Sequence, residues 1–182
     1  MQKGQTNNAG FTLLELLITL VIAAILASFA VPSFTGIIKN NLMAIQYNEL
    51  LTNINLTRSE AIKRGTDVKI LSNNNANWEG GWIVYDDTDN DNIPDDTEII
   101  RITSPVSSSI TIKFNNGRKI TYHSTGLAGT AGTFTFCDDR TDPEYHAKAL
   151  IINSVGRARA AIDSNNDGIV ESGNDDNVSC SL

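Results

Sequence analysis

The stretch that decides the fold runs from residue 10 to residue 31 and reads GFTLLELLITLVIAAILASFAV. Of the 21 residues from Phe11 to Val31, only Glu15 is charged. A helix of that length extends roughly 32 Å, which is about the thickness of the hydrocarbon core of a bilayer. The stretch therefore predicts one membrane-spanning helix.

The ten residues before this helix are polar and end in Gly10, and Lys3 is the only charged residue among them. A secretory signal peptide is the plain alternative. Such a peptide has a shorter apolar region that is followed by an A-x-A-like cleavage site. The order found here, a polar leader, a glycine and then a long apolar helix, does not fit it.

The junction at residues 10–15, GFTLLE, resembles the class III signal of type IV pilins and pseudopilins. This resemblance implies that a prepilin peptidase cleaves after Gly10, removes residues 1–10 and methylates the new amino-terminal Phe11. It also implies a single-pass protein of the inner membrane, with a periplasmic carboxy-terminal head, that enters a pilus on assembly. Residues 11–31 would then be the polymerisation helix.

Glu15 would be the fifth residue of the mature chain. A carboxylate inside a membrane helix costs about 2.5–3.5 kcal/mol on insertion scales, so it needs a partner. In pilin-like assemblies this partner is thought to be the α-amine of the neighbouring subunit's first residue, here Phe11. The alternative is a carboxylate near the helix end that reaches water.

Composition excludes most enzyme classes. The 182 residues include 14 Lys and Arg against 21 Asp and Glu, for a formal charge of -7, with 41% apolar residues. Two Cys cannot build a tetrahedral zinc site from cysteine alone, the two His are equally sparse, and neither G-x-S-x-G nor H-E-x-x-H occurs. An acidic chain binds nucleic acid only through a local basic patch. We therefore expect a protein that is not an enzyme.

Helical periodicity resumes beyond Pro32, where a kink is expected. Apolar residues recur there every three to five positions and predict a soluble helical half at residues 32–64. Gly65, preceded by two basic residues, is a typical end for a helix. The apolar stripe comprises Ile38, Leu42, Ile45, Leu50, Ile54 and Ala61.

Residues 65–182 change to short β-branched runs separated by turn residues. We expect an α+β protein in which the long helix packs against a β-rich head of two small sheets or one curved sheet. Asn116-Gly117 predicts a type I′ hairpin between two of the strands. The predicted strands are Val68–Leu71, Trp82–Tyr85, Glu98–Ile102, Ile110–Phe114, Lys119–Tyr122, Thr133–Phe136, Leu150–Asn153 and Arg157–Ile162.

Three segments narrow the resemblance to the GspH/FimT branch, which contains FimT/FimU-type minor pilins and the type II secretion pseudopilin H. They are RSEAI at residues 58–62, WEGGW at 78–82 and GRAR at 156–159. We interpret Trp82 as core packing rather than a functional residue.

A pilin head faces the periplasm, where disulfides form and persist. A bond between Cys137 and Cys180 would close a loop of about 44 residues and stabilise the fold by about 4 kcal/mol on the chain-entropy model. It would also pin the polar carboxy-terminal tail. Two free thiols are the alternative.

Two acidic stretches are candidates for Ca²⁺. In the first, Asp87, Asp89, Asp91, Ile93, Asp95 and Glu98 occupy positions 1, 3, 5, 7, 9 and 12 of an EF-hand-like loop. Asn92 replaces the turn glycine, and strands rather than helices flank the loop. The second stretch, residues 163–174, has the glycine but lacks the acid at position 12. Solvated turns are the alternative for both.

The resemblance leaves three functions open. The first is that of a minor pilin near the tip of a type IV pilus, which supports pilus biogenesis. The second is that of a type II secretion pseudopilin, which contacts exoprotein. The third is that the chain, as a pilin, would also bind double-stranded DNA for natural transformation, without sequence preference. Arg157 and Arg159 lie two apart on a predicted strand, roughly 6–7 Å from each other on one face, and Gly156 would leave room for close approach. Arg140 and Lys148 could join this patch.

Overall fold

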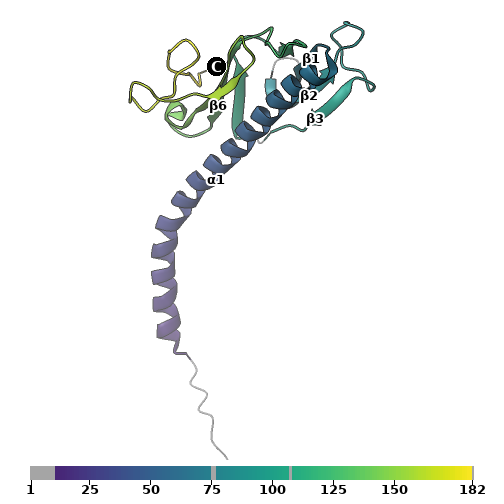
Figure 1. Ribbon diagram of the computed structural model, residues 1–182. Helices are drawn as coiled ribbons and strands as arrows, with labels where there is room; N and C mark the ends of the chain where they lie inside the picture. Colours follow the sequence, from purple (N-terminus) through teal and green to yellow (C-terminus); the bar gives the residue numbers. More distant parts are fainter. Residues whose placement is uncertain (1–10, 75–76, 107, 182) are drawn as a thin grey trace, which may run out of the picture. The chain divides into compact units, whose positions relative to one another are not determined.

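The computed structural model describes residues 11–74, 77–106 and 108–181, without the side chains of residues 30–33 and 74. The chain forms two compact units, and the boundary between them in the sequence falls between Ile38 and Lys39. Helix α1 (Leu13–Arg64) contributes to both of them (Figure 1). The predicted leader, residues 1–10, lies outside the described residues.

The first unit is the apolar part of α1. The helix starts where the Thr12 hydroxyl accepts a hydrogen bond from the backbone nitrogen of Glu15 at 3.2 Å. This is half of a capping box, in which Thr stands at the N-cap and Glu three residues later. Helix α1 continues through Pro32 without interruption. The kink expected at this proline stays a prediction.

The helical part of the second unit buries one face. Met43, Leu50, Ile54 and Ala61 are buried, and the polar residues Asn53 and Thr57 lie among them. Buried residues recur every three to four positions along this face, as an amphipathic helix requires. The predicted stripe was wrong at Ile38 and Ile45, which are 56% and 57% exposed. In this unit the buried face passes through Met43 instead of Ile45.

Two four-stranded antiparallel sheets complete the second unit. The first sheet has the order β3-β2-β1-β5 and the second has the order β4-β6-β7-β8. The first comprises β1 (Val68–Asn74), β2 (Asn77–Asp86), β3 (Ile99–Thr103) and β5 (Lys119–Tyr122). The second comprises β4 (Ile110–Phe114), β6 (Gly132–Asp138), β7 (Lys148–Ile152) and β8 (Ala158–Ala160), with the 3₁₀ helix η1 (Pro143–His146) between β6 and β7.

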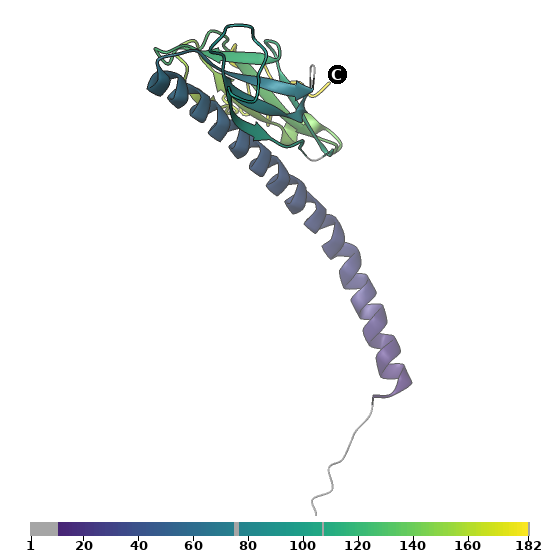
Figure 2. The same cartoon turned by 90° about the vertical axis from the view of Figure 1, so that its right-hand side faces the viewer.

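All eight predicted strands are present; two have the predicted bounds, and the ends of the others differ by up to five residues. The head is therefore built of two sheets, and the residues of α1 that belong to this unit run along the strands (Figure 2). The α+β fold expected from the sequence is confirmed.

The predicted hairpin at Asn116-Gly117 was wrong. Gly117 does adopt a positive φ of 92°, as a tight turn requires. However, β4 pairs with β6 and β5 pairs with β1, so this turn carries the chain from one sheet to the other. A local turn signal specifies the reversal of the chain but not which strands pair.

The core lies between α1 and the two sheets and is rich in aromatic rings. Trp78 meets Phe134 edge-to-face with ring centroids 4.7 Å apart, and Phe114 stacks on Phe134 at 4.4 Å. Trp82 is fully buried in the same cluster, which confirms its interpretation as core packing.

The tail is held by the predicted disulfide. Cys137, in β6, is bonded to Cys180, and their Cα atoms are 5.8 Å apart. A small apolar cluster that includes Ala149 and Val178 surrounds the bond. The bond therefore anchors the last residues of the chain to the second sheet.

Candidate functional sites

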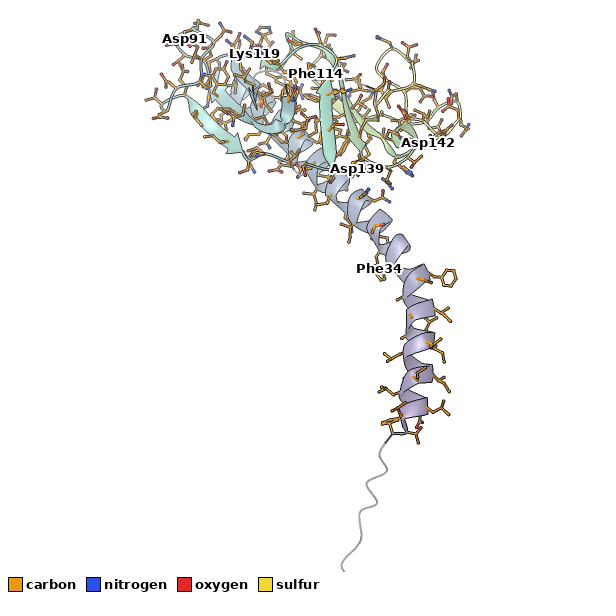
Figure 3. The ribbon with its side chains drawn as sticks, turned by 180° about the vertical axis from the view of Figure 1, so that it is seen from behind. Phe34, Asp91, Phe114, Lys119, Asp139 and Asp142 are labelled. Carbon is orange, nitrogen blue, oxygen red and sulfur yellow. A yellow bond between two sulfur atoms is a disulfide. The ribbon has the colours of Figure 1, made fainter. Side chains whose placement is uncertain are left out.

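The apolar part of α1 is the first candidate. Every side chain from residue 11 to residue 29 is exposed within its unit, and Phe11 is 82% exposed. Figure 3 shows these side chains projecting from the helix on all sides. One helix in the described part of the chain, α1, is long and apolar enough to cross a membrane. Gly10, the predicted cleavage residue, lies outside the described residues.

Glu15 is exposed in the first turn of α1 and is the only charged residue among these apolar side chains. A negative charge in the first turn of a helix is favoured by the partial positive charge of the helix amino terminus. The sequence therefore supports the helix locally while leaving the carboxylate open to a partner outside the chain.

The second candidate is the pair Arg157 and Arg159. Arg157 immediately precedes β8, so it does not lie within the strand as predicted. Arg159 is the middle residue of β8 and is paired with Ile151 of β7. Both side chains are exposed. No ion pair to either guanidinium is found within residues 11–74, 77–106 and 108–181.

Gly156 has a different role from the one expected. It is buried, with φ of 79°, and a Cβ atom there would lie 2.1 Å from the carbonyl oxygen of Gly126. The missing side chain therefore serves close packing inside the head, so the prediction that Gly156 leaves room for DNA was wrong.

Arg58 of α1 binds the backbone next to Gly156, and the sequence did not indicate this contact. Its Nε donates to the carbonyl oxygen of Gly126 at 3.0 Å, and its Nη2 donates to that of Val155 at 3.5 Å. The RSEAI segment of the helix is thereby hydrogen-bonded to Val155, the residue that precedes the GRAR segment. The Tyr122 hydroxyl is also buried nearby, and burial raises the pKa of Tyr122 to about 12.

Arg140 does not join the basic pair. Its Nε donates to Asp138 Oδ2 at 2.8 Å, and its Nη2 donates to Asn40 of α1 at 2.8 Å. Burial acts to raise the pKa of Asp138, but the hydrogen bonds from Arg140 outweigh it and the pKa lies below its ordinary value. Arg140 follows the end of β6, whereas Arg159 is level with the start of β6 and is separated from it by β7.

A polar cavity of about 540 Å³ lies beside Arg159. Ligand sites commonly have volumes of about 300–1,000 Å³. Besides Arg159, the side chains that give the cavity its polar character are those of Asn115, Asn116, Asn153 and Asn174. The guanidinium thus borders a neutral, hydrogen-bonding surface.

The first acidic loop is the third candidate. One carboxylate oxygen from each of Asp87, Asp89 and Asp91 lies within 4.8 Å of the others. Asp95 instead turns to Thr97, accepting hydrogen bonds from its backbone nitrogen at 2.8 Å and its hydroxyl at 2.6 Å. The structure therefore brings three of the predicted ligands together and leaves Asp95 out.

Two lysines that the sequence reading missed lie against this loop. Lys69 of β1 contacts the Asp87 carboxylate and donates to Asn92 Oδ1 at 3.0 Å, and Lys119 of β5 contacts the same Asn92 oxygen. Figure 3 shows Lys119 and Asp91 at the same end of the head. Burial acts to raise the pKa of Asp87, but Lys69 and a backbone hydrogen bond lower it overall.

The second acidic loop satisfies its own carboxylates. Asp163 accepts hydrogen bonds from three backbone nitrogens, among them that of Gly168 at 2.8 Å. Glu171 is buried, and its two oxygens accept from the backbone nitrogens of Ser164 and Asn165. Calcium binding at this loop stays a prediction.

Comparison with known proteins identifies the family. The family model described as type II transport protein GspH matches residues 46–156, which is more than half of the chain. The chain belongs to the GspH family. The prokaryotic N-terminal methylation motif also matches residues 5–31. No match was found among curated proteins.

Solved structures agree with this assignment. The type IV minor pilin FimU of Pseudomonas aeruginosa is 19% identical, with a TM-score of 0.58 over 68% of this chain and 91% of that one. A second crystal form of FimU is matched with 18% identity and a TM-score of 0.51, over 63% and 89%. This likeness shows a shared pilin-like fold.

Some of the candidate sites lie inside the residues that match the GspH family model, and others lie outside them. The match includes Arg58 and the loop at residues 87–98, but it ends at Gly156, so Arg157 and Arg159 lie beyond it. As a pilin-like subunit of the GspH/FimT type, the chain is a structural protein and not an enzyme. It belongs to a class whose members assemble with other pilin or pseudopilin subunits.

Proposed function

We propose that the chain is a minor type IV pilin that supports pilus biogenesis near the pilus tip. Prepilin peptidase would cleave between Gly10 and Phe11 and methylate Phe11, and α1 would anchor the protein in the inner membrane with its head in the periplasm. The observation that carries this proposal is the fully exposed apolar helix with a single charge at Glu15.

The physical argument rests on what must cover this helix. Apolar side chains on all sides of one helix are unfavourable in water. Lipid covers them before assembly, and the helices of neighbouring subunits cover them in the filament. Glu15 then pairs with the α-amine of a neighbour's Phe11, which offsets the cost of burying the carboxylate.

The test is a deletion strain assayed for piliation, twitching motility, natural transformation and exoprotein secretion, with complementation by the wild-type chain. Loss of piliation and twitching is the expected result. Loss of exoprotein secretion alone would contradict the proposal and favour a type II secretion pseudopilin of the H type.

Binding of double-stranded DNA is a second candidate function, favoured by the exposed guanidinium groups of Arg157 and Arg159, which have no ion pair among the described residues. Guanidinium binds phosphate through two parallel hydrogen bonds, and phosphate contacts carry no sequence information. Two to four such contacts predict a log–log salt slope of about -2 to -4. The net charge of -7 opposes binding, so several subunits along a filament would be needed for strong attachment.

The experiment titrates the full chain in detergent micelles with duplex DNA at several salt concentrations. Arg157→Gln combined with Arg159→Gln should reduce the affinity and make the slope shallower by about 2. The control is Arg101→Gln combined with Lys63→Gln, which removes the same charge from exposed positions on β3 and α1. Equal losses in both double variants would contradict a role for the Arg157 and Arg159 pair.

A further inference from the structure

Glu98 carries an unsatisfied buried oxygen at the end of the first acidic loop. The residue is 5% exposed. Its Oε1 accepts hydrogen bonds from the backbone nitrogen of Thr88 at 2.8 Å and from the Thr88 hydroxyl at 3.0 Å. Its Oε2 is buried without a hydrogen-bond partner among the described residues. A buried carboxylate oxygen without a partner is strongly unfavourable unless a cation is present.

The Glu98 carboxylate is held by a residue of the loop that carries the aspartate cluster. Thr88, which holds the Glu98 carboxylate, stands between Asp87 and Asp89 in the chain. The two oxygens of a carboxylate share one carbon, so Oε2 lies beside Thr88 as well.

The local charges do not balance. Residues 87–98 contain six carboxylates, and the cations that contact this loop in the described structure are Lys69 and Lys119. Lys69 compensates Asp87. Asp89, Asp91 and Glu98 have no ion pair within the part of the chain that the structure describes. A bound cation would relieve the repulsion between the clustered carboxylates.

We infer that the loop between β2 and β3 binds a calcium ion through the carboxylates of Asp87, Asp89, Asp91 and Glu98. Hard oxygen ligands select Ca²⁺ or Mg²⁺ over softer transition metals. A flexible loop with several carboxylates suits the larger Ca²⁺, because Mg²⁺ demands near-ideal octahedral geometry and retains its waters. Extracellular modules bind calcium with Kd of about 10⁻⁴–10⁻³ M, which is the range expected here.

The test measures thermal unfolding and calorimetric binding of the full chain in detergent micelles after treatment with EDTA. Addition of CaCl2 to about ten times the Kd should raise the Tm by about 5 °C. An equal concentration of MgCl2 should raise it by less than half as much. No heat of binding and no change in Tm at about 10 mM CaCl2 would overturn the inference.

Glu98→Gln distinguishes an ion ligand from a merely structural residue. The amide oxygen can still accept from Thr88, while the buried charge is removed. In EDTA this variant should be at least as stable as the wild type, because an unpaired carboxylate has gone. In CaCl2 it should be less stable than the wild type, with a Tm that no longer responds to the ion. A calcium response of the same size as in the wild type would overturn the inference.

Two further variants locate the ion. Asp89→Asn combined with Asp91→Asn alters exposed side chains and should weaken calcium binding at least tenfold. Asp167→Asn in the second acidic loop is the matched control and should leave the calcium-dependent rise in Tm unchanged. If Asp167→Asn abolished the response while the first double variant retained it, the site would be the second loop and the inference would be wrong.

Discussion

Arg58 of α1 donates a hydrogen bond through Nε to the carbonyl oxygen of Gly126 at 3.0 Å. The same carbonyl oxygen lies where a side chain at Gly156 would begin. One helix residue therefore holds together two turns that are distant in sequence, and one of these turns leads directly into Arg157. The position of Arg157 therefore depends on the buried contacts between Arg58, Gly126 and Gly156.

Gly156→Ala should destabilise the head by about 3 kcal/mol, because it combines a positive φ with a backbone clash. The control is Gly117→Ala, where φ is also positive but the space is open. It should cost only about 1 kcal/mol. Chemical denaturation of both variants gives the difference. Equal losses would show that the approach of Gly126 does not matter.

Arg58→Met should lower the free energy of unfolding by about 2 kcal/mol, since two carbonyl acceptors lose a charged donor. Arg58→Lys should recover only part of this loss, because lysine cannot reproduce the fork of the guanidinium. Urea denaturation measures both. If Arg58→Met were as stable as the wild type, the attachment of the helix to the two turns would contribute nothing.

Cys137→Ser combined with Cys180→Ser should destabilise the protein by about 4 kcal/mol on the chain-entropy model. The Cys137–Cys180 bond constrains the unfolded chain and anchors the tail to the second sheet. Thermal unfolding of the wild type with and without a reductant is the companion measurement. A wild type whose Tm did not respond to the reductant would contradict this role.

Asp138 should make stability depend on pH in acid. Its pKa in the folded protein is lowered. Its contribution is therefore present above the ordinary carboxyl pKa of about 3.9, and it is lost as the pH falls through the lower folded value. Unfolding measured from pH 6 to pH 2 should show a steeper acid loss for the wild type than for Asp138→Asn. Parallel curves would contradict the ion pair with Arg140.

Much of the fold was predictable because its signals are local. The strands coincide with β-branched runs, and α1 coincides with the long apolar stretch and the periodic apolar residues that follow it. The turn at Asn116-Gly117 was misread because strand pairing is decided by the whole sheet. Met43 was overlooked because an unbranched methionine gives a weaker apolar signal than Ile45, two residues further on.

The sites were less predictable because their partners are distant in sequence. Gly156 was assigned to ligand approach, although it serves packing against Gly126. The contact between Lys69 and Asp87 could not be predicted, since only the folded sheet places β1 beside the loop. The carboxylate spacing at residues 87–98 did predict a cluster, but it could not show that Asp95 turns to Thr97.

Glu15→Ala should leave membrane insertion intact or improve it, because a charge that is costly in the membrane is removed. Incorporation into filaments should nonetheless fall at least tenfold, because the subunit loses the group that pairs with its neighbour's amine. Immunoblots of membranes and of sheared pili measure the two quantities separately. Glu15→Ala present in pili at the wild-type level would contradict the pairing.

The most direct test of the account is the mass of the amino terminus of the chain extracted from membranes. Cleavage between Gly10 and Phe11 should give a first peptide that begins at N-methylated Phe11. Gly10→Val should block this processing and leave the leader attached. A wild-type chain that retains Met1 in the membrane would contradict the assignment of the protein as a pilin.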